Sequence, residues 1–372
     1  MRAAHEWAAR IFFIGRGGMM APRYLFICPN LTAPSGGIAV LYDCVSILRQ
    51  AGYDAFVVHE GPGIRYPLYP EDVPILYTLK TRQNRIGRIG MRARPGYGAA
   101  ILRDRITGAK DRMVHLTERD VLVAPEFMLT DVIDSFPGQP KIVLSQNSFA
   151  YLDSVYTLNR FGLDCDDGVI ANIGISRSCL EAFDLVGGRA PHYVPVSPNL
   201  SLFDFRETKS AKIAYMPRKR PEEAVLIDRA LRQRGRIGQF DLCRIDGMPQ
   251  PEVAAHLGDS LIFISLMKAE ALGFPAIEAM ASGCIVVGYT GFGTEEYFDE
   301  TTGFPITEGD TAGLVKTVEA VVAEYAADPT RLDAMRRRAS EVVRTRYNPQ
   351  RFRQALLKTW DAISSNTQGG QG

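Results

Sequence analysis

The chain alternates short apolar runs with amphipathic segments, and this alternation restricts the fold more than any other feature. Residues 23–28 (RYLFIC) form an apolar run, the turn-rich segment PNLTAPSGG follows, and residues 38–51 carry apolar side chains at helical spacing. Gly52 ends that helix, and residues 54–58 (DAFVV) form a second apolar run. Because strands joined through a helix must run parallel, we expect an opening βαβ unit.

The same pattern continues and then restarts after a proline-rich stretch at residues 191–203. In the first half we expect further strands at residues 121–123, 142–144, 168–173 and 193–196. In the second half we expect strands at 212–215, 240–245, 261–266 and 284–288, with helices at 222–234, 251–257, 275–281, 311–326 and 349–363. The sequence therefore predicts an α/β protein of two doubly wound domains that face one another across a cleft.

Composition agrees with two ordinary globular domains. The chain has 372 residues, and its 43 Lys and Arg against 42 Asp and Glu leave a formal charge of +1, which argues against a general nucleic-acid binder. Six scattered cysteines without zinc spacing indicate a reduced, cytoplasmic setting. The run IFFIG near the start is too short for a signal peptide, and no run is long enough to cross a bilayer.

Residues 268–298 (KAEALGFPAIEAMASGCIVVGYTGFGTEEYF) carry the most informative pattern. The turn Gly273-Phe274-Pro275 opens a helix, and we expect Glu278 on its first turn. A carboxylate there can accept both hydroxyls of a ribose, while Glu270 ends the preceding strand, where open α/β sheets bind ligands. The alternative is a Glu favoured by the helix dipole together with an ordinary surface Glu.

The spacing of Glu270 and Glu278 within GFPAIEAMASG resembles the E-x7-E signature of the retaining GT-B nucleotide-sugar glycosyltransferases, the "glycosyl transferases group 1" family. Other stretches follow in the family's order: SGGIAVLYDCVSILRQAGYDAFVV, VIANIGISRSCLEAF, VPVSPNLSLF and YMPRKR. The resemblance implies a GT-B fold, with two facing Rossmann-like domains, and transfer of a sugar from a nucleotide diphosphate with retention of configuration.

The resemblance also implies roles for particular residues. Glu278 would hold the ribose, and Glu270 with the N–H groups of Leu272, Gly273 and Phe274 would hold the sugar hydroxyls. Two glycine turns would approach the donor; they are Gly36 and Gly37 at the first helix, and Gly291, Gly293 and Thr294, with Glu295 or Glu296 as the acid at the end of the second turn.

Two departures from the family pattern are visible. The family has an Arg followed five residues later by a Lys near the diphosphate, but here Arg218 is followed by Glu223. Lys219 or Arg220 must then supply the second positive charge. Leu200 also stands where the family usually has Gly. With these cations we expect no metal and no cofactor, and we give the Asp164-Cys165-Asp166 sequence no metal-binding role.

The resemblance implies that the first domain takes the acceptor. Gln146 and Asn147 follow a strand and are suited to hydrogen bonding with sugar hydroxyls, although Asn147 is equally suited to capping a helix. We also name His115 as an acceptor-side base or orienting residue. Residues 80–112 hold ten basic side chains against two acidic ones, a local charge of +8. This segment would meet an anionic lipid-linked or saccharide acceptor, or the membrane surface that holds it.

We therefore expect a cytoplasmic glycosyltransferase, with a peripheral place on the inner face of the membrane, that serves polysaccharide or glycolipid synthesis in the bacterial cell envelope. The alternatives are a GT-B nucleotide-sugar 2-epimerase, whose usual histidines have no counterpart here, and a GT-B-shaped binding protein that has lost catalysis. The expected domains are residues 23–198 and 199–346. Residues 1–22 would be a loose arm or start-site artefact, and residues 347–372 a terminal helix, packing back on the first domain, and a flexible tail.

Overall fold

A computed structural model describes residues 21–30, 35–59, 65–66, 73–77 and 114–368. The chain divides into two compact units. The first unit comprises residues 1–175, 179–194 and 353–372, and the second comprises residues 176–178 and 195–352. The main boundary thus falls at residue 195, where the sequence analysis places it at residue 199.

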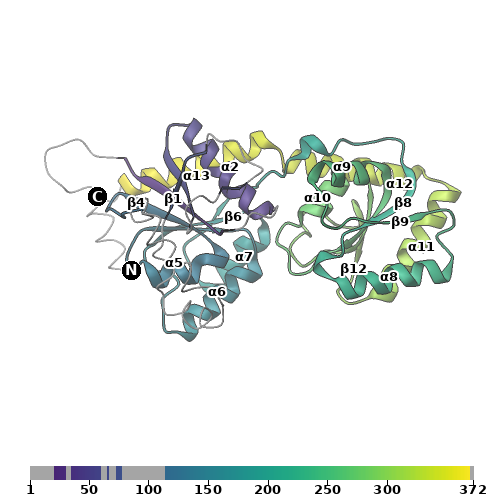
Figure 1. Ribbon diagram of the computed structural model, residues 1–372, viewed down its shortest axis with the longest axis horizontal. Helices are drawn as coiled ribbons and strands as arrows, with labels where there is room; N and C mark the ends of the chain where they lie inside the picture. Colours follow the sequence, from purple (N-terminus) through teal and green to yellow (C-terminus); the bar gives the residue numbers. More distant parts are fainter. Residues whose placement is uncertain (1–20, 31–34, 60–64, 67–72, 78–113, 369–372) are drawn as a thin grey trace, which may run out of the picture. The chain divides into compact units, whose positions relative to one another are not determined.

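The first unit is built on a seven-stranded parallel sheet of order β3-β2-β1-β4-β5-β6-β7 (Figure 1). Its strands are β1 (Arg23–Cys28), β2 (Asp54–His59), β3 (Ile75–Tyr77), β4 (Asp120–Pro125), β5 (Lys141–Ser145), β6 (Val169–Gly174) and β7 (His192–Tyr193). Every residue of β4 and β5 is buried, as expected of a parallel sheet covered on both faces. The chain order reverses direction between β1 and β4, the position at which such sheets bind ligands.

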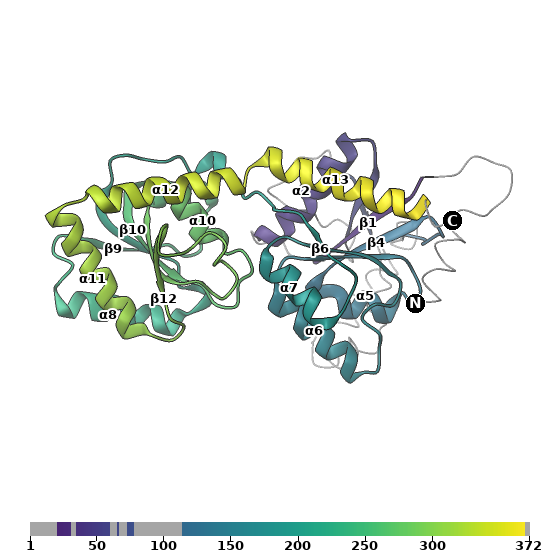
Figure 2. The ribbon, with the colours of Figure 1, turned by 180° about the vertical axis from the view of Figure 1, so that it is seen from behind.

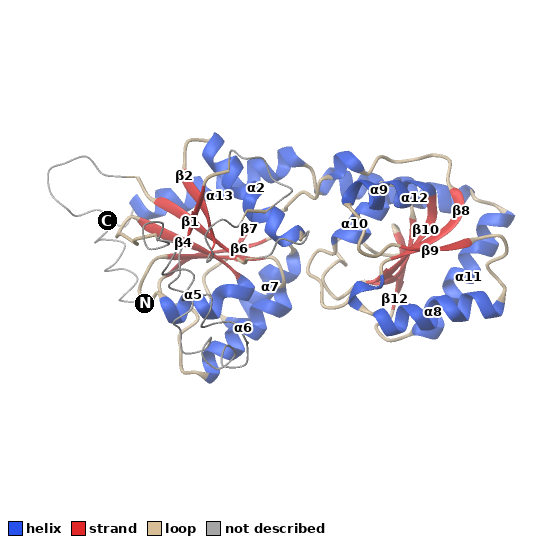
Figure 3. Ribbon diagram, in the orientation of Figure 1, coloured by secondary structure: helices blue, strands red, loops and turns tan. Residues whose placement is uncertain are grey.

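Helices cover both faces of this sheet, as Figure 3 shows. They are α2 (Gly36–Gln50), α5 (Leu129–Ser135), α6 (Ser148–Arg160), α7 (Arg177–Val186) and α13 (Pro349–Gln368), with the 3-10 turn η3 (Glu126–Met128). The C-terminal helix α13 belongs mostly to this unit, because the indole of Trp360 stacks on Phe26 at 5.7 Å and meets Tyr24 edge-on at 5.6 Å between ring centroids.

The second unit has a five-stranded parallel sheet of order β12-β11-β10-β8-β9. Its strands are β8 (Ser210–Tyr215), β9 (Asp241–Arg244), β10 (Ser260–Leu266), β11 (Ile285–Tyr289) and β12 (Gly303–Ile306). Its helices are α8 (Pro221–Arg234), α9 (Gln250–Asp259), α10 (Phe274–Ala281), α11 (Thr311–Ala327) and α12 (Thr330–Arg346), with the 3-10 turns η4 (Leu200–Leu202) and η5 (Pro217–Lys219). Figure 2, from behind, shows α10 and α12 on the opposite face of the sheet from α8 and α11.

The expected alternation of strands and helices is confirmed in both units, with differences at the ends of elements. The strand expected at 193–196 is a two-residue strand, β7, because the chain from Val194 turns into the proline-rich connection. Helices α5, α6, α7 and α12 were not expected from periodicity. The described helices include none that is both long and apolar enough to cross a membrane.

Candidate functional site

Two turns meet at the carboxyl edge of the second unit's sheet. One follows β10 and leads into α10, and the other follows β11. The N–H of Glu270 donates to the carbonyl of Gly291 at 3.1 Å, which ties the two turns together. Ala269 and Phe292 both have positive φ, at 49° and 69°, a conformation that costs a residue with a side chain free energy. Strain of this kind concentrates at functional sites when the surrounding structure enforces it.

Gly273 and Gly293 allow this close packing. A Cβ on Gly293 would lie 2.0 Å from the carbonyl oxygen of Glu270, and one on Gly273, at φ 65°, would lie 2.1 Å from the sulfur of Met267. The Tyr297 hydroxyl donates to the carbonyl of Leu272 at 2.6 Å, and the Thr294 hydroxyl donates to the backbone carbonyl of Thr290 at 2.7 Å. The turns are therefore rigidly built, with the buried side chain of Thr294 used to hold its own turn.

The start of α10 presents backbone donors beside this turn. Within the described part of the chain, no hydrogen bond occupies the N–H groups of Leu272, Gly273 and Phe274. The Gly273 carbonyl already accepts from Ala276, as the first bond of the helix. The three free N–H groups form a site for oxygen atoms of a ligand.

Glu278 lies on the second turn of α10, which corrects the expected first-turn position, because the helix begins at Phe274. Its side chain is only 8% exposed. Burial raises the pKa of Glu278 to about 8, although a hydrogen bond with the Gln250 side chain works in the opposite direction. A buried carboxyl with one hydrogen-bond partner costs stability, and such groups are concentrated at functional sites.

The basic turn η5 places Lys219 beside Glu270. The ammonium group of Lys219 lies 3.1 Å from the Glu270 carboxylate, and both side chains are partly exposed. Arg218 is exposed, and no ion pair or hydrogen bond with another described residue holds its side chain. Lys219 and Arg218 therefore lie on one turn at the carboxyl end of β8, next to β10.

Arg220, the other residue expected to replace the family's Lys, is part of the fold. Its guanidinium donates to the carbonyl of Met267 at 3.1 Å and to the carboxylate of Glu223 at 3.2 Å, pairs with Glu308, and stacks over the Tyr289 ring at 4.5 Å. Only 10% of its side chain is exposed. The choice between the two cations therefore favours Lys219.

Glu223 occupies the family's Lys position and has its own partners. The hydroxyl groups of Tyr289 and Thr311 both donate to its carboxylate. Burial alone would raise the pKa of Glu223, but these hydrogen bonds and the Arg220 charge outweigh it and lower the pKa. A permanent anion thus holds Arg220 in place where the family has a cation.

The first unit brings Gly37 and Gln146 together at the carboxyl edge of its own sheet. The side-chain amide of Gln146 donates to the Gly37 carbonyl at 3.1 Å. The backbone N–H of Gln146 donates to a carboxylate oxygen of Glu126 at 2.8 Å. Glu126 is 3% exposed, and burial raises its pKa to about 7. Gly36, Gly37 and Gln146 therefore form one cluster with Glu126, next to the point where the sheet order reverses.

Asn147 caps α6, which decides between its two expected roles in favour of the cap. Its side-chain oxygen accepts from the N–H groups of Phe149 at 3.0 Å and Ala150 at 3.1 Å. His115 is exposed and precedes β4, so it lies at the amino edge of the sheet, whereas Gln146 lies at the carboxyl edge. The structure does not bring His115 together with the other acceptor-side residues.

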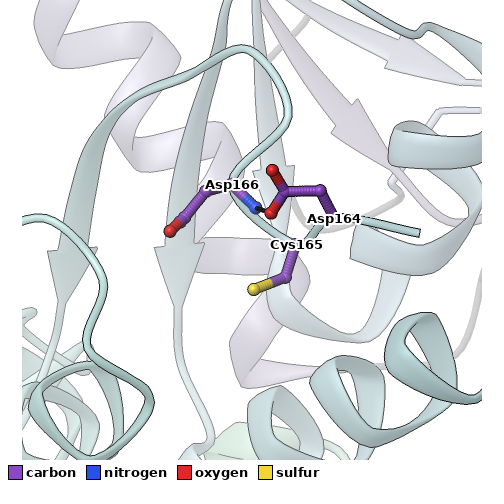
Figure 4. Close-up of side chains that lie close together, drawn as sticks. All are labelled: Asp164, Cys165 and Asp166. Atoms are coloured by element: carbon purple, nitrogen blue, oxygen red, sulfur yellow. Dashed lines mark hydrogen bonds between the residues drawn. The ribbon is translucent and has the colours of Figure 1, made fainter. Parts of the chain in front are cut away.

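Asp164, Cys165 and Asp166 lie within reach of a shared ion, since their potential ligand atoms are within 4.8 Å of one another (Figure 4). The N–H of Asp166 donates to a carboxylate oxygen of Asp164 at 2.9 Å, the dashed line in Figure 4, which is the geometry of a tight turn. Burial raises the pKa of the Cys165 thiol and so disfavours the thiolate that metals bind. The cluster precedes β6, at the edge opposite Gln146.

Sequence reasoning missed Glu126 and Tyr66. Glu126 directly follows a fully buried strand, and that position was a usable signal for a side chain at the carboxyl edge. Tyr66 lies in a segment without periodicity, and its contact with Ser35 spans 31 residues, so no local pattern marks it. The expected basic segment, residues 80–112, lies outside the described residues.

Sequence comparisons match the part of the chain that contains these turns to a known family. Residues 243–342, which include both turns, α10 and most of α12, match the family described as glycosyl transferases group 1. An alpha-1,6-glucosyltransferase of Actinobacillus pleuropneumoniae is 41% identical over 69 residues. That match covers 18% of this chain and 21% of the relative. The resemblance expected from residues 268–298 is thereby confirmed.

Two solved structures resemble the fold across most of the chain. The HepE protein of Anabaena, solved in complex with UDP and glucose, has a TM-score of 0.62 at 15% identity and covers 92% of this chain and 100% of its own. Sucrose-phosphate synthase from Thermosynechococcus elongatus has a TM-score of 0.63 at 14% identity over 93% of this chain and 100% of its own. The GT-B type of fold, with two Rossmann-like α/β units, is therefore confirmed.

Proposed function

We propose that this chain, which has the GT-B fold and a second unit matched by the glycosyl transferases group 1 family, transfers a sugar from a nucleotide diphosphate to a polysaccharide or glycolipid acceptor with retention of configuration. The transfer would serve cell-envelope or exopolysaccharide synthesis from the cytoplasmic side. The observation that carries the proposal is the convergence of Glu278, three free backbone donors and two exposed cations at one sheet edge.

The donor would use each of these groups differently. Glu278 would accept the two ribose hydroxyls as a carboxylate. Arg218 and Lys219 would offset the diphosphate charge, with the Gly36–Gly37 turn as a further donor of N–H groups. Glu270 and the N–H groups of Leu272 to Phe274 would hold the sugar hydroxyls. With two cations for one diphosphate, this arrangement requires no metal.

Chemistry would follow a front-face route. The acceptor oxygen forms its bond to the anomeric carbon as the bond to the leaving phosphate breaks, on the same face, and that phosphate takes the acceptor proton. The chain would contribute by positioning the reactants and by stabilising the charge that grows on the phosphate. Lys219 must exchange its ion pair with Glu270 for one with the phosphate.

On the acceptor side, Gln146 is the strongest contributor, and the basic segment of residues 80–112 would favour an anionic acceptor or an anionic membrane surface. Sedimentation with anionic vesicles at low salt tests the membrane idea. The protein should pellet with the vesicles, and protein that stays in the supernatant would contradict it.

Calorimetric titration with nucleoside diphosphates tests the donor site. A thermal-shift screen of nucleoside diphosphates and their sugars first selects the base, since a ligand of the native state raises the melting temperature. Glu278→Ala and Arg218→Ala should each weaken binding of the selected diphosphate about tenfold or more. Glu341→Ala and Arg229→Ala, at exposed positions of α12 and α8, are matched controls that should bind normally. Unchanged affinity in both site variants would refute the donor assignment.

The second candidate is a nucleotide-sugar binding protein without catalysis. The observation in its favour is Glu223, a half-buried anion with three partners at the position where the family has a Lys. Release of free nucleoside diphosphate from a panel of sugar nucleotides, with an acceptor mixture present, separates the two. Binding without release would favour this candidate.

A further inference from the structure

The first turn of α2 has an unusual start. Ser35 has the extended N-cap conformation, at φ −145° and ψ 123°, but its side chain caps no N–H group. No hydrogen bond between described residues occupies the N–H groups of Gly36, Gly37 and Ile38. A helix normally uses its N-cap side chain to satisfy one of these donors, at a gain of about 1 kcal/mol. Here the Ser35 side chain does not contribute this stabilisation, and the three N–H groups have no hydrogen-bond partner among the described residues.

Tyr66 holds this helix start in place of a cap. Its hydroxyl accepts from the N–H of Ser35 at 2.7 Å and donates to the carbonyl of Ser35 at 3.1 Å. The same carbonyl accepts from Ala39 as the first bond of the helix. Tyr66 therefore fixes the peptide groups of the residue before the helix without using any N–H group of the first turn.

Tyr66 is itself fixed by a buried chain of hydrogen bonds. Its backbone N–H donates to the Tyr42 hydroxyl at 3.1 Å, and that hydroxyl bonds Nε2 of His59 at 2.8 Å. Burial lowers the pKa of His59 to about 4, so at neutral pH the imidazole is uncharged and Nε2 can accept the Tyr42 proton. All three side chains are at most 1% exposed, so the chain leaves the Tyr66 phenol little freedom to move.

The opposite side of the turn is held in the same manner. Gln146 bonds the carbonyl of Gly37, not its N–H, and Glu126 holds the backbone of Gln146. The network of Tyr66 thus holds the turn through Ser35, and the network of Gln146 holds it through the Gly37 carbonyl. Neither network bonds the N–H groups of the first helical turn. Because neither network uses these N–H donors, the donors remain a site for an anion or for a row of hydroxyl oxygens.

We propose that Tyr66 is a positioning residue, which holds the Ser35 peptide so that the N–H groups of Gly36 to Ile38 stay free to bind the diphosphate of a nucleotide. This inference rests on the proposed function.

Tyr66→Phe removes both hydrogen bonds and keeps the ring. We expect the Ser35 amide to exchange its hydrogen about tenfold faster or more, and binding of the diphosphate selected by the thermal-shift screen to weaken about five- to tenfold. Tyr42→Phe, which removes the support one step back, should change both quantities in the same direction by less. Tyr151→Phe, also a buried tyrosine of this unit, is the matched control and should leave both unchanged.

A purely structural role predicts a different result. In that case Tyr66→Phe would lower the melting temperature and speed the exchange of Ser35 while diphosphate affinity stayed the same, and the inference would be wrong. Unchanged exchange at Ser35 would also overturn it, since the hydroxyl would then hold nothing. If the wild-type chain binds no nucleoside diphosphate, the proposed function fails first, and this inference fails with it.

Discussion

Gly37 and Gly293 both lie at the carboxyl edge of a parallel sheet, one in each unit, yet a methyl group added to each would meet different surroundings. At Gly293 it would overlap the backbone of Glu270 at 2.0 Å. At Gly37 its nearest described neighbour is the side-chain oxygen of Gln146 at 3.4 Å, an ordinary contact. Packing requires the glycine of the second unit, whereas packing among the described residues tolerates a side chain at Gly37. Two glycine turns at similar places in their sheets can therefore need glycine for different reasons, since close packing requires it at Gly293 but not at Gly37.

Gly293→Ala should have the largest effect on stability. The turn after β10 and the turn after β11 must move apart to admit the methyl group, and overpacking of this kind costs about 3 kcal/mol. Gly37→Ala should leave the free energy of unfolding unchanged or raise it by about 0.5 kcal/mol, because alanine favours a helix. It should nevertheless weaken diphosphate binding, since Gly37 carries one of the free N–H groups and an added methyl group would crowd a ligand bound there. Urea unfolding measures the stability of both variants, and calorimetry measures their binding of the diphosphate. Equal losses of stability in the two variants would contradict the contrast between Gly293 and Gly37.

The pH dependence comes next, because the second unit contains Glu278, a carboxyl whose pKa burial raises. Its pKa of about 8 exceeds the usual 4.5, so between these values the folded chain keeps a proton that the unfolded chain loses. The free energy of unfolding should therefore fall as pH rises from about 4.5 to 8. Binding should have the opposite slope, because ribose hydroxyls donate to a carboxylate, and affinity should rise by up to about tenfold per pH unit below pH 8.

Glu278→Gln should flatten both slopes, while Gly37→Ala should lower affinity by the same factor at every pH. Titrations in two buffers of different ionisation enthalpy would also detect the proton that the wild type releases on binding. A Glu278→Gln variant that keeps the wild-type pH dependence would show that another group titrates.

Glu270→Gln should give the smallest effect, with the opposite sign. Removing the Glu270 charge frees Lys219, and a partly exposed pair of this kind is worth less than about 1 kcal/mol, so a nucleoside diphosphate should bind about two- to fivefold more tightly. Sugar transfer should fall, because a donor-sugar contact is altered. Weaker diphosphate binding by Glu270→Gln alone would contradict the proposed exchange of partners at Lys219.

The sequence predicted the elements whose apolar period is regular and the residues that end them. Strand β1, helix α2 and strand β2 were expected within a few residues, because a buried parallel strand is uniformly apolar and Gly52 ends a helix locally. The cluster of Glu278, Gly273 and Glu270 was predicted for a similar reason, since all three lie within nine residues around one helix start.

Contacts across long sequence separations were not predictable in this way. Arg220 and Lys219 are neighbours in the chain and equally basic, and only the positions of Glu223 and Glu308 show that one is structural and the other faces the site. Tyr66 depends likewise on Ser35 and Tyr42, which local patterns do not connect to it. Glu278 was placed one residue too early in its helix, because α10 begins with Phe274 rather than after it.

The division of the chain between the two units has a consequence for biosynthesis. Residues 195–352 form most of the second unit as one continuous stretch, whereas the first unit also includes residues 353–372, with Trp360 packed on Phe26 in its first strand. During translation the first unit is made first but cannot bury Phe26 until the last helix has left the ribosome. The second unit can therefore finish folding before the first unit does. The first unit is completed when helix α13 packs on strand β1.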